Sequence, residues 1–259
     1  MATYAIFGAT GNCGGALIEN LLPSPEATIH AYCRNGAKLE NQFPSAVKSG
    51  RIKIFEAQID NVDVFARCVR GCRAVFTAVS MNDNIPKVRV AEDMTITLIA
   101  ALKRVRDEDP DAKLPRIVVL SSASLEESLC GNFPRVMHWI VTHCNSNVYA
   151  DLREQENLLR AEESWLTSIF IKPGGLSKDA QRGHKLNLEE QETFVSYLDL
   201  AAGMLEAADD VDGRYDMRNV SVNNTGGPAK FPKVLPLLAV VGLLRHYFPW
   251  MHPYLPYLG

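Results

Sequence analysis

The sequence has no block of charge of one sign. Its 259 residues include 27 lysines and arginines and 30 aspartates and glutamates, which gives a net charge of −3. Domains that bind nucleic acid concentrate basic residues on one face or along one helix. This composition therefore argues against a nucleic-acid partner.

The sequence also lacks an apolar run long enough to cross a membrane. Its most apolar stretch, residues 234–244, is shorter than the ~20 residues that a spanning helix needs. No signal peptide is expected, because Met1-Ala2-Thr3 leads directly into an apolar stretch without a charged leader. We therefore expect a cytoplasmic protein with no integral membrane span.

The cysteines lack the spacing of a zinc site or a disulfide framework. The six cysteines are scattered along the chain, and no second pair of Cys or His residues complements Cys68 and Cys72. We expect reduced thiols, as in a cytosolic protein, and no metal site. The sequence also has no internal repeat.

A glycine-rich turn close to the N-terminus is the most informative feature that is present. Gly8, Gly11 and Gly14 follow an apolar run at 4–7 and precede apolar residues at helical spacing in 16–22. They therefore lie between a strand and a helix. In a dinucleotide-binding turn such glycines allow a sharp bend, a close approach to the pyrophosphate, and packing of the helix on the strand.

The start of the following helix would present free N–H groups and a positive dipole to phosphates. An ordinary glycine turn is the alternative, and the flanking strand and helix favour the dinucleotide site. The residues expected to bind the cofactor at this turn are Gly8, Thr10, Gly11, Asn12, Cys13 and Gly14.

The end of the next expected strand, residues 28–33, favours NADP over NAD. An NAD enzyme usually places an acid ~20 residues beyond the glycines, whereas a basic residue there accommodates the 2′-phosphate of NADP. Arg34 stands near that position, and Lys38 follows about one helical turn later. A solvated loop arginine is the alternative interpretation.

Strands alternate with helices along most of the chain, which predicts an α/β fold with a Rossmann-type doubly wound parallel sheet. Strands are expected at 4–7, 28–33, 52–57, 74–79, 116–120, 167–171 and 220–222, and helices at 62–69, 88–105, 149–163 and 197–208. Ligands of such sheets lie beyond the carboxyl ends of the strands. The residues expected near the cofactor there are Ala78, Val79, Lys172 and Pro173.

The chain divides into a dinucleotide-binding domain with substrate-site insertions, 1–225, and a small apolar C-terminal extension, 226–259. Segment 130–147 is rich in aromatic residues and is expected to form a helix or a loop over the site. We expect the extension to cover the substrate as a lid or to form a dimer contact. Interfacial membrane attachment and core packing are the alternatives.

The chain resembles the short-chain dehydrogenase/reductase superfamily, in its atypical branch related to the NmrA-like NAD(P)-binding group. The motifs that carry this resemblance are GATGNCGG at 8–15, RNGAK at 34–38, SSAS at 121–124, YADLR at 149–153 and KPG at 172–174. More narrowly, 4–15, 29–39 and the tail are similar to the averufin oxidase A group of fungal polyketide-pathway oxidoreductases. Relatives often have Gly-Asp where this chain has Ala-Gln-Ile-Asp at 57–60, so Gln58 is expected to contact the adenine.

The resemblance also implies a set of catalytic residues. Typical members use a serine, a tyrosine and a lysine, the last two as Tyr-x-x-x-Lys, because a tyrosine with a pKa near 10 needs a cationic neighbour. Here Tyr149 has Arg153 at the lysine position. Arg153 is expected to lower the tyrosine pKa by its charge, but a guanidinium does not exchange protons at neutral pH. Ser121 or Ser122 is expected to bind the reacting oxygen.

His138 and His143 are alternative acid–base groups, because histidine titrates near neutrality. A structural role for these histidines, and for Tyr149 as a packed helix residue, stays open. Together the features predict an NADPH-dependent oxidoreductase that acts on a small hydrophobic aromatic or polyketide-derived carbonyl or alcohol in secondary metabolism, with a homodimer as one assembly. The altered Tyr-x-x-x-Lys keeps two alternatives: an NmrA-like redox sensor without turnover, and a non-redox isomerase or cyclase.

Overall fold

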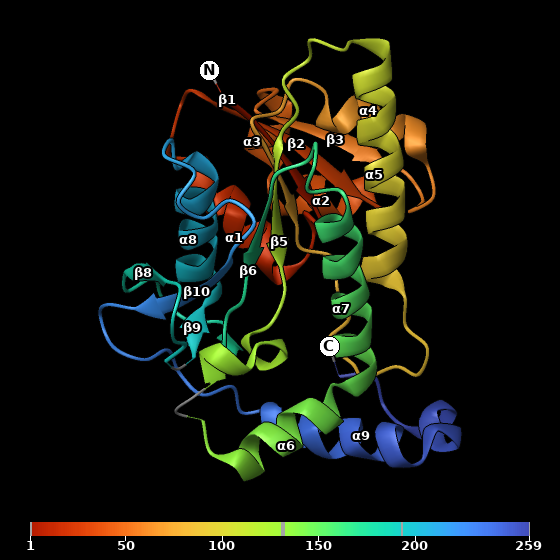
Figure 1. Ribbon diagram of the computed structural model, residues 1–259, viewed down its shortest axis with the longest axis vertical. Coiled ribbons are helices and arrows are strands. Elements are labelled where there is room, and N and C mark those ends of the chain that lie inside the picture. The colour runs from red at the N-terminus through yellow and green to blue at the C-terminus, as the bar shows by residue number, and fades with distance from the viewer. Residues whose placement is uncertain (1, 131–132, 193, 259) are drawn as a thin grey trace.

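The computed structural model, which describes residues 2–130, 133–192 and 194–258, is built on an eight-stranded sheet (Figure 1). The strand order is β3-β2-β1-β4-β5-β6-β10-β8; the first seven strands are parallel, and β8 is antiparallel to β10. The strands are β1 Ala2–Phe7, β2 Ala27–Cys33, β3 Ile52–Glu56, β4 Ala74–Thr77, β5 Arg116–Leu120, β6 Ser168–Ile171, β8 His184–Asn187 and β10 Asn219–Asn224. The short strands β7 (Leu176–Ser177) and β9 (Val195–Ser196) form a second sheet.

Helices cover both faces of the large sheet (Figure 1). The helices are α1 Asn12–Leu21, α2 Gly36–Gln42, α3 Pro44–Lys48, α4 Val62–Val69, α5 Val90–Glu108, α6 Arg135–Cys144, α7 Ser146–Ala161, α8 Tyr197–Asp209 and α9 Leu235–Tyr247, with 3₁₀ turns η1 Ala123–Leu125, η2 Glu127–Cys130 and η3 Pro249–Tyr254. Helices α1 and α8 pack together on one face, while α5 packs between α4 and α7 on the other. The predicted Rossmann-type α/β fold is confirmed.

Strand β1 shows why this fold requires continuous apolar strands. Ile6 packs in the core that contains Leu17 of α1, whereas its neighbour Phe7 packs against Phe65 of α4 on the opposite face. Successive strand residues point to opposite faces, so a sheet covered on both faces needs apolar residues at every position. Burial of each such large side chain stabilises the fold by ~1.5–3 kcal/mol.

The C-terminal extension packs on α6 rather than on the sheet, and α6 and α9 lie side by side below it (Figure 1). Gly242 permits this close approach, because a Cβ there would lie 2.1 Å from the carbonyl oxygen of Cys144. Segment 130–147 was expected to be a helix or a loop; residues 131 and 132 lie outside the described residues, and Arg135–Cys144 form α6. Among the described residues, the structure contains no helix that meets the length and apolarity of a membrane span.

A buried ion pair fixes the extension to the loop after β4. The Arg245 side chain is 1% exposed and donates from Nη1 to Asp83 Oδ1 at 2.7 Å, and the same carboxylate accepts from the Leu258 N–H. Asn84 donates to the carbonyl oxygen of Gly242. The extension is therefore joined by specific polar contacts to a loop that leaves the carboxyl edge of the sheet.

Candidate cofactor and catalytic site

The glycine turn has the shape that a phosphate-binding turn requires. Gly8 has φ 88°, and a Cβ on it would lie 2.5 Å from the carbonyl oxygen of Ala78. A Cβ on Gly14 would lie 2.2 Å from the carbonyl oxygen of Gly8, so α1 packs directly on the turn. Gly11 is the N-cap of α1 and makes no side-chain capping bond. The turn thus presents a helix start and close backbone, which fit a dinucleotide pyrophosphate.

The other predicted cofactor residues of the turn have distinct surroundings. Thr10 is half-buried, whereas Asn12 is exposed at the first position of α1 and interacts with the Tyr197 hydroxyl. Cys13 is buried, and burial raises the pKa of its thiol to about 12. Its side chain therefore belongs to the core, and any phosphate contact from this residue would come from its N–H.

The predicted 2′-phosphate residues lie just after β2. Arg34 and Lys38 are both exposed, and the Asn35 side chain accepts from the Lys38 N–H at 3.1 Å, which begins α2. Glu56 at the end of β3 accepts from the Gly36 N–H at 3.0 Å and holds this loop against the sheet. Gln58 is exposed in the loop that follows β3.

Two neighbouring serines at the end of β5 point to different partners. Ser122 donates to the Tyr149 hydroxyl at 3.3 Å, whereas Ser121 is buried and donates to Glu156. The Glu156 carboxylate also pairs with the Lys172 ammonium at 2.9 Å. Of the two predicted serines, the structure therefore brings Ser122, and not Ser121, to the tyrosine.

Lys172 is part of this buried cluster, which changes its expected role. Its side chain is 2% exposed and paired with Glu156, so any cofactor contact from this residue would come from its backbone. Pro173, also buried, accepts through its carbonyl oxygen from the Ala123 N–H at 2.9 Å. Glu156 was not among the predicted site residues, although it lies seven residues, or about two helical turns, after Tyr149 on α7.

The pKa of Tyr149 is raised, and burial is the main cause. Hydrogen bonds from Ser122 and Ser124 lower it and only partly offset the burial. Arg153, which was expected to lower this pKa, is exposed on α7, and the shift is accounted for by burial and by other neighbours. Tyr149 is therefore a protonated hydroxyl at neutral pH.

The two predicted histidines lie on α6. The His138 Nε2 lies 3.4 Å from the carbonyl oxygen of Ser124, which lies within η1, the turn that Ser122 begins. His143 contacts the carbonyl oxygen of Trp139 at 2.7 Å, and its ring packs against His246 of α9. His138 is therefore near the serine loop, whereas His143 takes part in the packing of α6 on α9.

The predicted site residues share one edge of the sheet. Each of the following directly succeeds a parallel strand or lies within a few residues of its carboxyl end: Gly8 after β1, Arg34 after β2, Gln58 after β3, Ala78 and Val79 after β4, Ser121 and Ser122 after β5, and Lys172 and Pro173 after β6. Tyr149 on α7 joins this edge through Ser122. The arrangement can hold a dinucleotide beside a hydroxyl pair.

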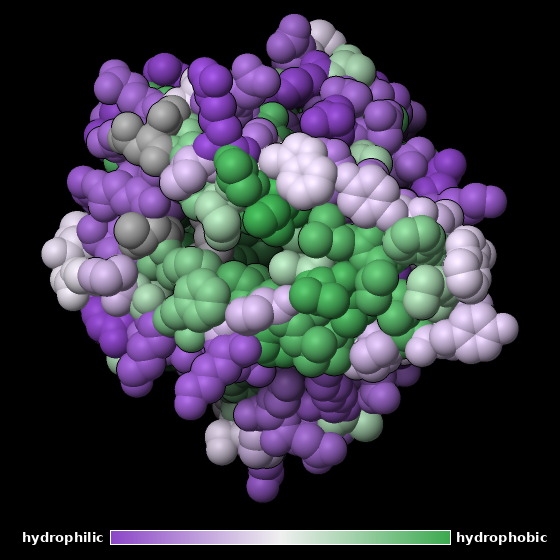
Figure 2. Space-filling view, turned by 90° about the horizontal axis from the view of Figure 1, so that it is seen from below, coloured by the Kyte–Doolittle hydropathy of each residue, from purple (hydrophilic) through white to green (hydrophobic). Residues whose placement is uncertain are grey.

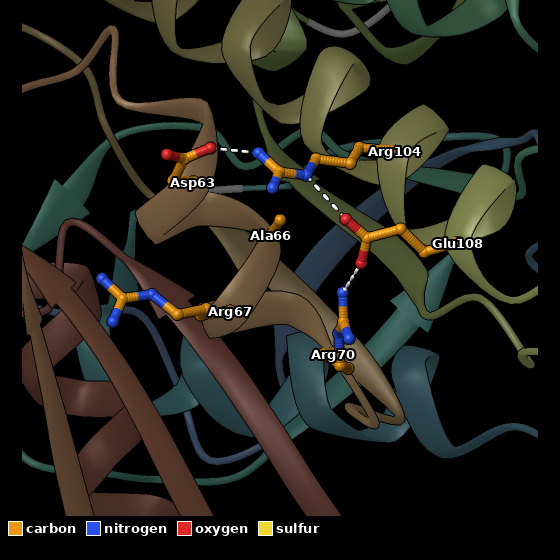
Figure 3. Close-up of a pocket in the computed structure, with 6 residues that line it drawn as sticks. All are labelled: Asp63, Ala66, Arg67, Arg70, Arg104 and Glu108. Atoms are coloured by element: carbon orange, nitrogen blue, oxygen red, sulfur yellow. Dashed lines mark hydrogen bonds and ion pairs between the residues drawn. The ribbon is translucent and has the colours of Figure 1, made fainter.

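A groove of about 470 Å³ lies elsewhere, between α4 and α5 (Figure 3). Its walls carry ion pairs that join Arg104 to Asp63 and Glu108, and Arg70 to Glu108. Arg70 and Glu108 lie at the ends of their helices, which run antiparallel to the strands, and therefore near the amino edge of the sheet. This charged groove is thus separate from the candidate site.

Comparisons with known proteins identify the family of the chain. A family model described as NAD(P)H-binding matches residues 8–211. Oxidoreductase AgnL4 of Paecilomyces divaricatus is 52% identical over 260 residues, covering 100% of this chain and 99% of that protein. Oxidoreductase aflX of Aspergillus parasiticus is 45% identical over 254 residues, covering 98% and 95% of the two chains.

Solved structures share the fold. A short-chain dehydrogenase/reductase from Veillonella parvula, determined in complex with NADP, superposes with a TM-score of 0.69. Its sequence is 20% identical, and the match covers 90% of this chain and 99% of that chain. At this identity the likeness concerns the fold alone.

Proposed function

Because the chain belongs to the NAD(P)H-binding family and is an oxidoreductase, we propose that it transfers hydride between NADPH and a hydrophobic aromatic or polyketide-derived carbonyl compound. The observation that carries this proposal is the Ser122–Tyr149 pair, whose oxygens lie 3.3 Å apart beyond the carboxyl end of β5. The glycine turn follows β1 at the same edge of the sheet. A hydroxyl pair beside a dinucleotide is suited to proton transfer at the reacting oxygen.

Reduction of a carbonyl is the proposed direction, in which the Tyr149 hydroxyl supplies the proton. A tyrosine that stays protonated at neutral pH is ready to donate its proton to the substrate oxygen. NADPH, when bound, supplies the hydride that the carbonyl carbon accepts. Tyr149 would give its proton to the oxygen, so that the C–H and O–H bonds of the alcohol form while a C–H bond of the cofactor and the O–H bond of the tyrosine break. The tyrosinate would recover a proton from solvent, and Ser122 would orient the hydroxyl.

Arg34 and Lys38 would hold the 2′-phosphate of NADPH. Both side chains are exposed at the carboxyl end of β2, so a phosphate could approach two positive charges there. The Glu56 carboxylate also lies at this loop, where it accepts from the Gly36 N–H at 3.0 Å. A charge-assisted hydrogen bond contributes about 1.5–3 kcal/mol. Loss of one of these cations is therefore expected to weaken NADPH binding at least about tenfold.

Binding titrations of both cofactors test the NADPH assignment. Arg34→Gln is expected to raise the Kd for NADPH and leave the Kd for NADH nearly unchanged. Lys48→Gln is the matched control, because Lys48 is an exposed lysine at the end of α3, before β3 begins. Equal affinity of the parent protein for NADPH and NADH would contradict this part of the proposal.

A redox sensor that binds the dinucleotide without turnover is a second candidate. Two observations favour it. The lysine position of Tyr-x-x-x-Lys holds the exposed Arg153, and the Lys172 ammonium is paired with Glu156, so neither supplies a lysine beside Tyr149. Assays of NADPH consumption with hydrophobic aromatic ketones and quinones separate the two functions. Tight NADPH binding without consumption of any such carbonyl would support the sensor.

A further inference from the structure

Helices α6 and α9 and the turn η3 together expose an extensive apolar surface, which we call the α6–α9 face. Figure 2 shows apolar side chains gathered across the lower face of the molecule, with polar residues around them. Large exposed side chains of these elements are Trp139, Leu237, Val240, Tyr247, Trp250 and Tyr254. Single exposed apolar residues are common, but a contiguous apolar face of this kind marks an interaction surface.

The charges of these segments are all positive. Residues 229–258 contain Lys230, Lys233 and Arg245 but no aspartate or glutamate, and residues 133–145 contain Arg135 but no acid. Arg245 is buried against Asp83, so the exposed cations are the other three. The Lys230 ammonium pairs with Asp179 at 3.7 Å and its N–H donates to the same carboxylate, so the flanking cations without an ion pair among the described residues are Arg135 and Lys233. The face therefore combines apolar residues with flanking positive charge.

The aromatic residues of the face are of the kind that gathers at membrane–water interfaces. Trp250 is 70% exposed, and Tyr247 and Tyr254 are also exposed. Tryptophan and tyrosine join an apolar ring to a polar group, which suits them to the level of lipid headgroups. Helix α9 is strongly apolar but spans only 13 residues, so its length suits a position on a bilayer surface rather than across it.

We propose that the α6–α9 face docks onto the surface of an anionic phospholipid bilayer. The apolar side chains would enter the headgroup region while Arg135 and Lys233 pair with lipid phosphates and carboxylates. A second copy of the chain is a poorer occupant. A two-fold interface would set this surface against itself, and its cations would face each other in segments that contain no carboxylate.

Vesicle sedimentation with the full-length protein tests this docking. The protein is expected to pellet with vesicles of equal parts phosphatidylcholine and phosphatidylserine, more weakly with phosphatidylcholine alone, and less as salt is added. A triple variant, Leu237→Ser, Val240→Ser and Trp250→Ser, is expected to bind at least about tenfold more weakly, because it removes apolar area from the contact. Lys233→Gln is expected to weaken binding about fivefold.

Val211→Ser is the matched control, because Val211 is 83% exposed and lies just after α8, near the amino end of β5. Its binding to vesicles is expected to equal that of the parent protein. Circular dichroism checks that the triple variant folds, and if it does not, Trp250→Ser and Lys233→Gln decide the question singly.

Failure of the parent protein to bind phosphatidylserine vesicles would overturn the proposal, as would unchanged binding by the folded variants. Light scattering supplies the remaining outcome. A parent dimer that becomes a monomer in the triple variant, without vesicle binding, would assign the face to a second copy of the chain instead.

Discussion

Substitution of Glu156 by glutamine is expected to destabilise the fold strongly. The Glu156 carboxylate accepts from buried Ser121 and pairs with Lys172 at 2.9 Å, and Arg160 lies 3.5 Å from its second oxygen. Glutamine keeps the shape but removes the negative charge, so the buried ammonium loses its counter-ion. Loss of one partner of a buried ion pair costs about 3–5 kcal/mol. In a chain of this size that corresponds to a fall in Tm of roughly 10 °C.

Urea unfolding followed by circular dichroism measures this free energy. Lys185→Met is the control: it breaks the exposed Lys185–Glu192 pair, which is also 2.9 Å long, and should leave the midpoint nearly unchanged. The double variant Glu156→Leu with Lys172→Met should recover most of the lost stability, because apolar side chains can replace a buried pair. A loss below about 1 kcal/mol in Glu156→Gln would refute the electrostatic account of this cluster.

Three further predictions concern the candidate site. Gly14→Ala should abolish NADPH binding or lower stability, because its Cβ would lie 2.2 Å from the Gly8 carbonyl oxygen. Gly15→Ala should leave the Tm and the Kd for NADPH intact, since beyond its own helix backbone and chain neighbours no atom lies within 4 Å of its Cβ. The Kd and the Tm are measured for both variants, and equal effects would contradict the turn geometry. Tyr149→Phe should lower kcat for carbonyl reduction about 10²–10⁴-fold at an unchanged Kd for NADPH, and an unchanged kcat would remove the tyrosine mechanism. Burial raises the pKa of Tyr149, so its protonated form persists as the pH increases. The rate of reduction should therefore stay constant through neutrality and fall only above about pH 10. A pH–rate profile that falls near neutrality would assign the proton transfer to a histidine instead.

The central strands and several helices were predictable because each carries its own local pattern. The expected strand 116–120 and helix 62–69 have the same bounds as β5 and α4. Strand β8 was not predicted, since its sequence, His-Lys-Leu-Asn, is polar and it pairs only at the sheet edge. The sequence also did not decide whether segment 130–147 forms a helix or a loop, because the apolar residues of α6 face α9 and solvent rather than the sheet.

The edge at which the site lies could be predicted, but the partners of its side chains could not. Strand ends locate Ser121 and Ser122 equally well, and only the three-dimensional structure directs the first to Glu156 and the second to Tyr149. The pair Asp83–Arg245 joins residues 162 positions apart, which no local pattern predicts. The Tyr149 pKa likewise depends on burial by distant segments and not on its neighbour four residues along the helix.

Deuterium transfer tests the proposed reaction most directly. The parent protein is mixed with NADPH labelled at the transferable hydrogen and with a hydrophobic aromatic ketone, and the product is examined by mass spectrometry. The proposed function predicts one deuterium at the new carbinol carbon, with a rate that collapses in Tyr149→Phe while NADPH binding persists. Binding of NADPH without deuterium in any product would contradict it.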